Sequence, residues 1–205
     1  MQIPDWLKSL FGSLLGSVAA EATGLTPSGS VSASVTIPFG GPDNTAPAAD
    51  VLARGWSKSI SDCHPRIRAA WPIVQQAFIA AHPDCTFRVD YCWRSASFQL
   101  ELFKLGRSLV DGQWVVTDKS KVVTDKNGDE PSFHQTYPAA AADIYVVRGG
   151  LIVWPNEHDD AVCALYTELG HLWEQQGLVS GAVWRWKWRD WDHIQVGYDI
   201  KKIDS

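Results

Sequence analysis

Apolar side chains recur at helical spacing in three stretches of the larger, C-terminal part of the chain. The first stretch, 65–81, places its apolar residues on one side, as a helix that buries one face does. The second, 97–105, ends before Gly106, and the third, 159–175, ends before Gly177. Glycine commonly follows the last turn of a helix. These stretches therefore predict three amphipathic helices.

Other stretches favour β-structure. Residues 86–92 alternate well enough to predict a strand. Residues 141–147 and 151–154 are apolar and β-prone, and the Arg-Gly-Gly sequence at 148–150 between them predicts a hairpin. Residues 183–196 alternate large aromatic side chains with charges, which predicts an antiparallel strand or a hairpin.

Helices and strands are mixed in this order without a regular βαβ rhythm. The order predicts an α+β fold with a small, mainly antiparallel sheet flanked by helices. Between the second helix and the next strand, residues 108–131 are polar and contain glycine, so we expect a long loop there. Loops of this length are more often functional than not.

By composition the chain divides into three parts. Residues 1–25 predict an amphipathic helix, a candidate for peripheral contact with a membrane. A secretory signal is the alternative, because Lys8 precedes the apolar run and the Ala-Glu-Ala sequence at 20–22 resembles a cleavage site. Residues 26–49 are rich in Ser, Gly, Pro and Thr and predict a linker. We expect residues 50–205 to form the compact domain.

Composition and charge narrow the class of protein. The 205 residues, 45% of them hydrophobic, suffice for one core. The formal net charge of −5 is spread without basic blocks, which argues against nucleic-acid binding. The four cysteines lack CxxC spacing, so we expect buried free thiols, with a Cys85–Cys92 disulfide as the alternative. The eleven tryptophans suit core packing, and exposed ones would suit a groove for an amphipathic ligand.

Two histidines lie in contexts that suit a metal site. His134 stands in a predicted loop and is followed by Asp143 at the start of a predicted strand, while His193 lies in a strand-like stretch. Catalytic zinc typically has three such nitrogen and oxygen ligands and keeps its fourth position open. Each of these patterns, taken alone, is common by chance.

A carboxylate near such an ion can act as a general base. Zinc lowers the pKa of a coordinated water to roughly 7, and a neighbouring carboxylate can then accept its proton. Asp190 and Asp192 both precede His193. On a strand, Asp192 would point away from His193, and Asp190 would need a bend in the chain. Spacing therefore leaves both candidates open.

Four short blocks resemble, in the same order, those of the VanY-like zinc peptidases, and are most similar to the phage endolysin branch that cuts L-alanyl-D-glutamate. The resemblance covers roughly Ser61 to Gly197. The matching residues are 91–108 (YCWRSASFQLELFKLGRS), Ser132, His134, Pro138, Ala141, Asp143, Asp190, His193 and Gln195. Ordered blocks are a stronger signal than any one of them.

The resemblance implies a fold of the Hedgehog/DD-peptidase type with one bound Zn²⁺ ion. It implies that His134, Asp143 and His193 are the zinc ligands and that Asp190 is the general base.

The same resemblance implies three further site residues. Arg94 would lie in the active site, where its guanidinium would hold a substrate carboxylate or polarise the scissile carbonyl. Gln99 and Ser132 would be supporting polar groups that bind substrate. The sequence departs from the family at 181–188 (GAVWRWKW), where many relatives have a glycine-rich run, and this puts the choice of bond in question. The remaining histidines match no ligand position and are expected in packing, capping or surface roles: His64, His82, His158 and His171.

Together these observations predict a monomeric zinc metallopeptidase that hydrolyses the stem peptide of peptidoglycan. It would be a phage or bacterial protein, made in the cytoplasm and acting on the cell wall, with its export route left open. The resemblance favours an L-alanyl-D-glutamate endopeptidase, with a D-alanyl-D-alanine carboxypeptidase as the alternative. Two other classes remain: a non-catalytic cell-wall-binding module, because folds do not fix functions, and an interaction protein docked through residues 1–25.

Overall fold

The computed structural model describes residues 46–156, 158–184 and 189–203. The described residues belong to the second of the two units into which the chain divides, Asp43–Ser205. The predicted helix over 1–25 and nearly all of the predicted linker lie outside the described residues. Among the described helices, none is long and apolar enough to cross a bilayer.

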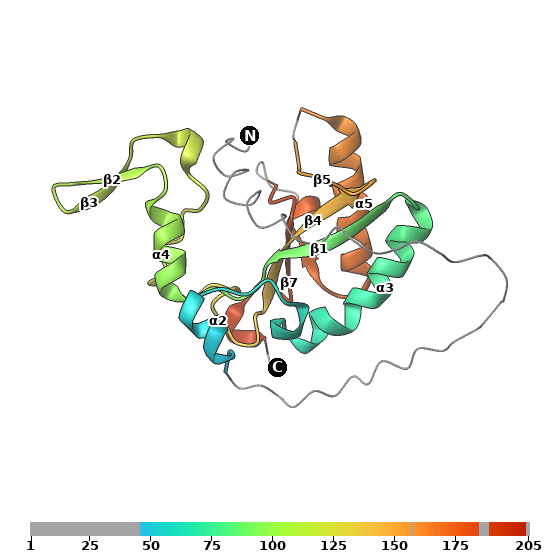
Figure 1. The fold of residues 1–205 in the computed structure, drawn as a ribbon, viewed down its shortest axis with the longest axis horizontal. Coiled ribbons are helices and arrows are strands. Elements are labelled where there is room, and N and C mark those ends of the chain that lie inside the picture. Colours follow the sequence, from blue (N-terminus) through green and yellow to red (C-terminus); the bar gives the residue numbers. More distant parts are fainter. Residues whose placement is uncertain (1–45, 157, 185–188, 204–205) are drawn as a thin grey trace, which may run out of the picture. The chain divides into compact units, whose positions relative to one another are not determined.

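A five-stranded antiparallel sheet forms the centre of the second unit (Figure 1). Its strands are hydrogen bonded in the order β1-β4-β7-β6, and β5 also pairs with β4. The longest strand, β4, is therefore central and β1 lies at one edge. The strands of this sheet are β1 (Cys85–Tyr91), β4 (Ala141–Arg148), β5 (Leu151–Val153), β6 (Val179–Ser180) and β7 (His193–Gln195).

Helices complete the fold. The α-helices are α2 (Ala49–Arg54), α3 (Pro65–Ala81), α4 (Ala96–Lys104) and α5 (Asp160–Gln175). Four single-turn 3₁₀ helices join them: η1 (Ile60–Asp62), η2 (Lys119–Lys121), η3 (Gly181–Val183) and η4 (Ile200–Lys202). The predicted fold class, α+β with a small antiparallel sheet flanked by helices, is confirmed.

The core lies between β1, α3 and α5, where aromatic rings pack edge to face. Phe87 of β1 contacts Trp71, Phe78 and Trp173, with ring centroids 4.8, 5.7 and 5.4 Å apart. Trp173 is fully buried, so this tryptophan has the core-packing role that was expected from the sequence. Removing a ring such as Phe87 would cost about 3–5 kcal/mol of stability.

Local sequence explains where the helices begin. Pro65 occupies the first turn of α3, where its missing N–H costs no hydrogen bond. Ser95 caps α4 by accepting from the Phe98 N–H, and Asp159 caps α5 by accepting from two backbone N–H groups. The three predicted helices are confirmed to within one residue at each end.

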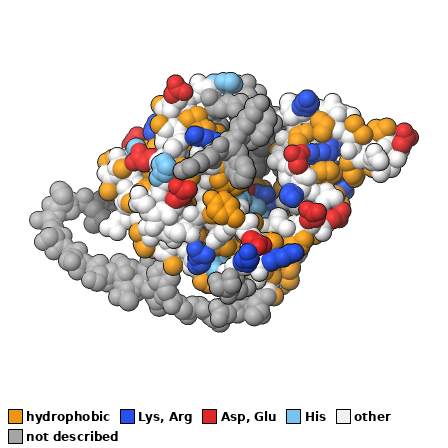
Figure 2. Space-filling model, turned by 180° about the vertical axis from the view of Figure 1, so that it is seen from behind, with side chains coloured by type: hydrophobic (Ala, Val, Ile, Leu, Met, Phe, Trp, Pro, Cys, Tyr) orange, Lys and Arg blue, Asp and Glu red, His pale blue; other side chains and the backbone are white. Residues whose placement is uncertain are grey.

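One predicted loop contains a hairpin. Within residues 108–131, strands β2 (Arg107–Val110) and β3 (Gln113–Val116) form a separate two-stranded sheet. Asp111 and Gly112 turn the chain with φ of 49° and 78°, the positive values that a tight hairpin turn requires. The Asp-Gly pair is a hairpin signal, so the prediction of an unstructured loop was wrong for these residues. Figure 2 shows apolar side chains exposed on this arm of the molecule.

The strand predicted over 183–196 is also wrong for most of its described length. The strand β7 is limited to three residues, His193–Gln195, and the chain before it turns, with the His193 N–H donating to the Asp190 carbonyl at 3.2 Å. Residues 185–188 lie outside the described part. In the described part of this stretch, residues 189–192 therefore form a turn into β7 and not a strand.

The alternative Cys85–Cys92 disulfide is excluded by the strand between them. Both thiols are free, and β1 keeps the two residues apart at about 3.3 Å per residue. A disulfide needs Cα atoms within about 7 Å. The Cys92 thiol instead contacts the buried thiol of Cys63 and the Ser59 carbonyl.

Candidate metal centre

Three metal-capable side chains from distant parts of the chain meet at one point. Asp143 of β4 and His193 of β7 stand directly opposite each other in the antiparallel register. His134 comes from the loop before β4, and its carbonyl accepts from the Arg94 N–H at 2.9 Å. The sheet therefore brings together Asp143 and His193, 50 positions apart, and the loop adds His134, 59 positions from His193.

The three ligand atoms form a nearly equilateral triangle. His134 Nε2 lies 3.4 Å from His193 Nδ1 and 3.3 Å from Asp143 Oδ1, and His193 Nδ1 lies 3.1 Å from Asp143 Oδ1. Ligands of a tetrahedral zinc ion with bonds of about 2.0–2.1 Å are separated by about 3.3 Å. The observed spacings therefore fit one small cation bound by all three residues.

The ring orientation of His134 is fixed from behind. Its Nδ1 lies 2.6 Å from the Cys92 carbonyl oxygen, which can only accept, so Nδ1 carries the proton that it donates. In the neutral ring this leaves the Nε2 lone pair directed at the triangle. Metal-ligating histidines are commonly held in this way by a carbonyl.

A side-chain amide fixes the ring orientation of His193. Its Nε2 lies 2.9 Å from Gln195 Oε1, and the Gln195 amide nitrogen donates to the Gly197 carbonyl. The Gln195 amide nitrogen is hydrogen bonded to the Gly197 carbonyl, so the Gln195 amide oxygen must face the His193 ring. That oxygen can only accept, and His193 Nε2 must therefore be the donor. Nδ1 is then the nitrogen available to a metal. The two histidines thus present different ring nitrogens, each selected by a partner.

Charges within the triangle are strongly coupled. Burial raises the pKa of Asp143, but the Arg94 guanidinium and the two imidazoles outweigh it and hold that pKa well below its usual range. Burial lowers the pKa of His134, and the attraction of Asp143 offsets this only in part. For His193 burial also lowers the pKa, yet the hydrogen bond to Asp143 and the charge of Asp190 raise it to about 9. A metal ion would displace a proton from His193.

Arg94 lies beside this centre, as the sequence predicted. Its guanidinium donates to Asp143 Oδ2, the carboxylate oxygen that is not in the triangle. The side chains of both residues are only 14% exposed. This contact orients the Asp143 carboxylate so that Oδ1 faces the two imidazoles. The Arg94 guanidinium also lies over the Tyr91 ring, 5.2 Å from its centroid.

The two candidate bases form a pair. Burial, followed by the charges of Asp143 and Asp190, raises the pKa of Asp192 well above its usual range. The Asp192 and Asp190 side chains lie close enough to form a hydrogen bond. Asp190 is the exposed member of the pair. Gly181 lies against it so closely that a Cβ there would stand 2.1 Å from the Asp190 carbonyl oxygen.

Three buried donors around the centre have no partner. Among the described residues, the buried polar side-chain atoms without a hydrogen bond include Arg94 Nε, Ser132 Oγ and Trp184 Nε1. Ser132 precedes His134 by two residues, and the Trp184 ring lies 6.0 Å from that of His193. All three can donate, and buried donors are rarely left unpaired without a reason. Arg94 contacts Asp143 and Trp184 lies beside His193, so their unpaired donors suit a ligand that carries oxygen acceptors.

Trp184 was not among the predicted site residues. It lies in the stretch where the sequence departs from the family pattern, so no motif pointed to it. Gln99 is placed differently from the other predicted residues. It is 2% exposed, and its amide nitrogen donates to Thr124 Oγ1 and the Lys126 carbonyl. In this structure it holds the 124–126 segment, and its predicted contact with substrate stays a prediction.

The other histidines lie apart from the centre. His64 caps α3 by accepting from the Arg66 N–H, at 3.2 Å. His82 pairs with Glu168 and His171 with Glu174. These are the capping and surface roles expected from the sequence.

Two comparisons with known proteins identify no relative of this chain. A scan against protein-family models finds no match, and a search of curated proteins finds no similar sequence. The resemblance to the VanY-like peptidases therefore depends on the short ordered blocks, and the metal centre depends on its own geometry.

Proposed function

We propose that this chain is a zinc-dependent peptidase that hydrolyses an amide bond in the stem peptide of peptidoglycan. The observation that carries the proposal is the triangle of His134 Nε2, Asp143 Oδ1 and His193 Nδ1, with sides of 3.1–3.4 Å. Two nitrogens and one oxygen make the ligand set of many hydrolytic zinc sites. The ordered sequence blocks support the choice of peptide substrate.

The residues present fit a zinc ion. His134, Asp143 and His193 would hold it, and each is oriented by a second group: the Cys92 carbonyl, Arg94 and Gln195 respectively. When bound in such a site, zinc lowers the pKa of water to about 7 and polarises a carbonyl group. The chain contributes the fixed ligand positions and the surrounding donors.

Asp190 would accept the proton that hydrolysis releases. It is exposed, and its charge is near enough to raise the pKa of His193. A proton acceptor at this position contributes typically about 10²–10⁴-fold to the rate.

The unpaired donors would orient the substrate. Arg94 Nε and Ser132 Oγ are buried and free to donate, and a stem peptide carries both carbonyl and carboxylate oxygens as acceptors. Arginine is suited to a carboxylate because of its planar fork. We propose cleavage between L-alanine and D-glutamate, with release of D-alanine from the peptide end as the alternative within the same chemistry. The chain would act as a monomer at the cell wall of a bacterium.

Mass spectrometry of digested peptidoglycan tests the proposal. Zinc-loaded protein should release fragments with a new L-alanine carboxyl end, whereas loss of terminal D-alanine would assign the carboxypeptidase alternative. Asp190→Ala should reduce the rate by about 10²–10⁴-fold and retain the zinc. Asp160→Ala, which removes an exposed aspartate on α5, is the matched control and should keep full activity. Binding to peptidoglycan without any cleavage would contradict the proposal and favour a binding module.

A further inference from the structure

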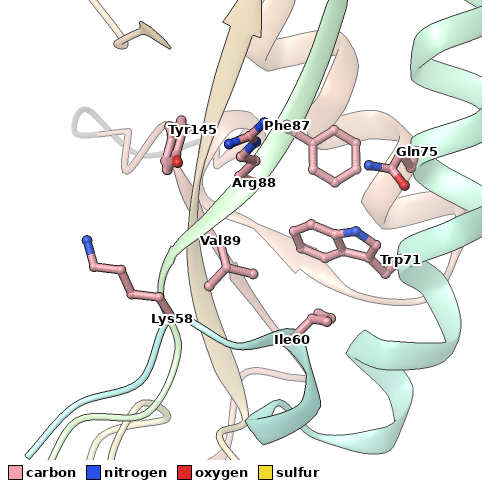
Figure 3. Close-up of a pocket in the computed structure, with 8 residues that line it drawn as sticks. All are labelled: Lys58, Ile60, Trp71, Gln75, Phe87, Arg88, Val89 and Tyr145. Carbon is pink, nitrogen blue, oxygen red and sulfur yellow. The ribbon is translucent and has the colours of Figure 1, made fainter. Parts of the chain in front are cut away.

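A hollow lies over the free edge of the sheet, apart from the metal ligands. It has a volume of about 410 Å³, within the range of ligand sites. Phe87 and Val89 line it from one face of β1, and Arg88 lines it from the other. Successive strand residues point to opposite faces, so a hollow that touches both faces must wrap around the edge of the strand (Figure 3).

This edge of β1 is open among the described strands. The sheet order places β4 on one side of β1 and no described strand on the other. Gln75 of α3 reaches around the edge to Thr86 Oγ1, at 3.4 Å. Backbone N–H and C=O groups along such an edge are available to an added strand.

Another segment of the same chain is hydrogen bonded to the backbone just beyond this edge. Just beyond β1, the Cys92 N–H donates to the Ser57 carbonyl at 2.9 Å, and the Ser57 N–H donates to the Trp93 carbonyl at 2.8 Å. This exchange is strand-like pairing, and the next residue, Lys58, lines the hollow and pairs with Asp90 at 2.9 Å. The segment at 56–57 therefore covers the edge after β1. No described strand pairs with 86–90 on this side, where the side chains of Gln75 and Lys58 contact Thr86 and Asp90.

The two sides of the hollow differ in chemistry. On the α3 side its wall is mainly apolar and aromatic, made by Ile60, Trp71, Phe87 and Val89, with Gln75 as the polar exception (Figure 3). On the other side Arg88 is exposed and forms no ion pair with the described residues. Side chains of a bound strand would alternate between these two sides, so the hollow complements a peptide in which apolar and carboxylate side chains alternate.

We propose that the edge of β1 over 86–90 binds an extended peptide by strand addition, with an apolar side chain against Ile60 and Trp71 and a neighbouring carboxylate at Arg88. The site is distinct from the metal ligands, although β1 leads toward them, since Tyr91 pairs with Asp143 in the sheet register. The proposal goes beyond the hydrolysis proposed above and does not require it.

The test is an NMR titration of the zinc-loaded full chain with the synthetic peptide acetyl-Val-Glu-Val-Glu-amide. Expected are shifts of backbone amides within 86–90. Affinity should fall at least tenfold with Arg88→Glu, and likewise when alternate peptide nitrogens are methylated, because methylation removes donors to β1. Arg88→Lys should retain binding. Lys119→Glu, an exposed charge reversal in η2, is the matched control and should bind as the unmodified chain does.

Two results would overturn the proposal: equal affinity of Arg88→Glu and the unmodified chain, or shifts confined to residues outside β1 and its neighbours. Folding of each variant is checked by its circular dichroism spectrum. Because the titration measures binding and not cleavage, a chain that binds the peptide but leaves peptidoglycan intact would refute the proposed hydrolysis alone. A chain that cleaves peptidoglycan but does not bind the peptide would refute strand addition alone.

Discussion

The metal centre and the β2–β3 hairpin use their side chains in opposite ways. At the centre, every proposed ligand is buried or nearly so and is held by a second group. In the hairpin, large apolar side chains such as Leu109 and Val115 are 59% and 45% exposed. The hairpin forms from a local turn, whereas the centre needs contacts between residues far apart in the chain. We therefore expect the centre to be intolerant of substitution and the hairpin tolerant.

Replacing Asp143 should give the largest effect. Asp143→Ala removes one ligand and leaves the Arg94 guanidinium buried without its carboxylate, which costs about 3–5 kcal/mol of stability. Zinc content, measured by atomic absorption, should fall to background, and the free energy of unfolding, measured with urea, should fall with it. Asp143→Asn should lose zinc with a smaller loss of stability. Retention of stoichiometric zinc by Asp143→Ala would contradict the assignment.

Gln195→Ala should give the next largest effect. It removes the acceptor that fixes the His193 ring, and losing such a partner typically weakens metal affinity by about 10–100-fold. Competition with a chelator of known affinity measures the change. Gln113→Ala in the hairpin is the matched control, since Gln113 is exposed, and its zinc affinity should be unchanged. Equal zinc affinities of Gln195→Ala and Gln113→Ala would contradict the expected difference in tolerance between the metal centre and the hairpin.

Asp90 allows a test by pH, outside the metal ligands. Burial raises the pKa of Asp90, although Lys58, at 2.9 Å, lowers it in part. With the folded pKa above the unfolded value, the stabilising contribution of protonated Asp90 is full below the unfolded pKa, about 3.9. It is lost as pH rises through the folded pKa. Asp90→Asn should abolish this decline. The slope of the unfolding free energy against pH should then differ from that of the unmodified chain by an amount that corresponds to at most one bound proton. Identical slopes would contradict the raised pKa.

The smallest effects are expected in the hairpin. Leu109→Ser and Val115→Ser replace exposed apolar side chains, and substitutions at such positions usually change stability by less than about 0.5 kcal/mol. Urea unfolding and zinc titration should match those of the unmodified chain. A loss above about 2 kcal/mol would show that the hairpin packs against another part of the protein.

Local signals in the sequence predicted most of the fold. Helix α5 was predicted from its apolar spacing and its acidic start, and the hairpin of β4 and β5 from two adjacent glycines. The β2–β3 hairpin could also have been predicted, because Asp111-Gly112 is a tight-turn signal. The strand predicted over 183–196 was wrong for residues 189–192, because alternating aromatics and charges do not by themselves distinguish a strand from a turn.

The centre was harder to predict from sequence. Ordered blocks indicated that His134, Asp143 and His193 belong together, and in the fold the sheet register pairs Asp143 with His193 while a loop adds His134. No local pattern could show which nitrogen each histidine presents, because the Cys92 carbonyl that decides it for His134 lies 42 residues away. Trp184 was missed for the same reason, since its nearness to His193 depends on the fold.

The most direct test of the central claim is the position of zinc in a crystal of the zinc-loaded protein, located by anomalous scattering at the zinc absorption edge. The account predicts one peak at about 2.0–2.2 Å from His134 Nε2, Asp143 Oδ1 and His193 Nδ1. A peak elsewhere, or coordination through the ring nitrogens that face Cys92 and Gln195, would contradict it.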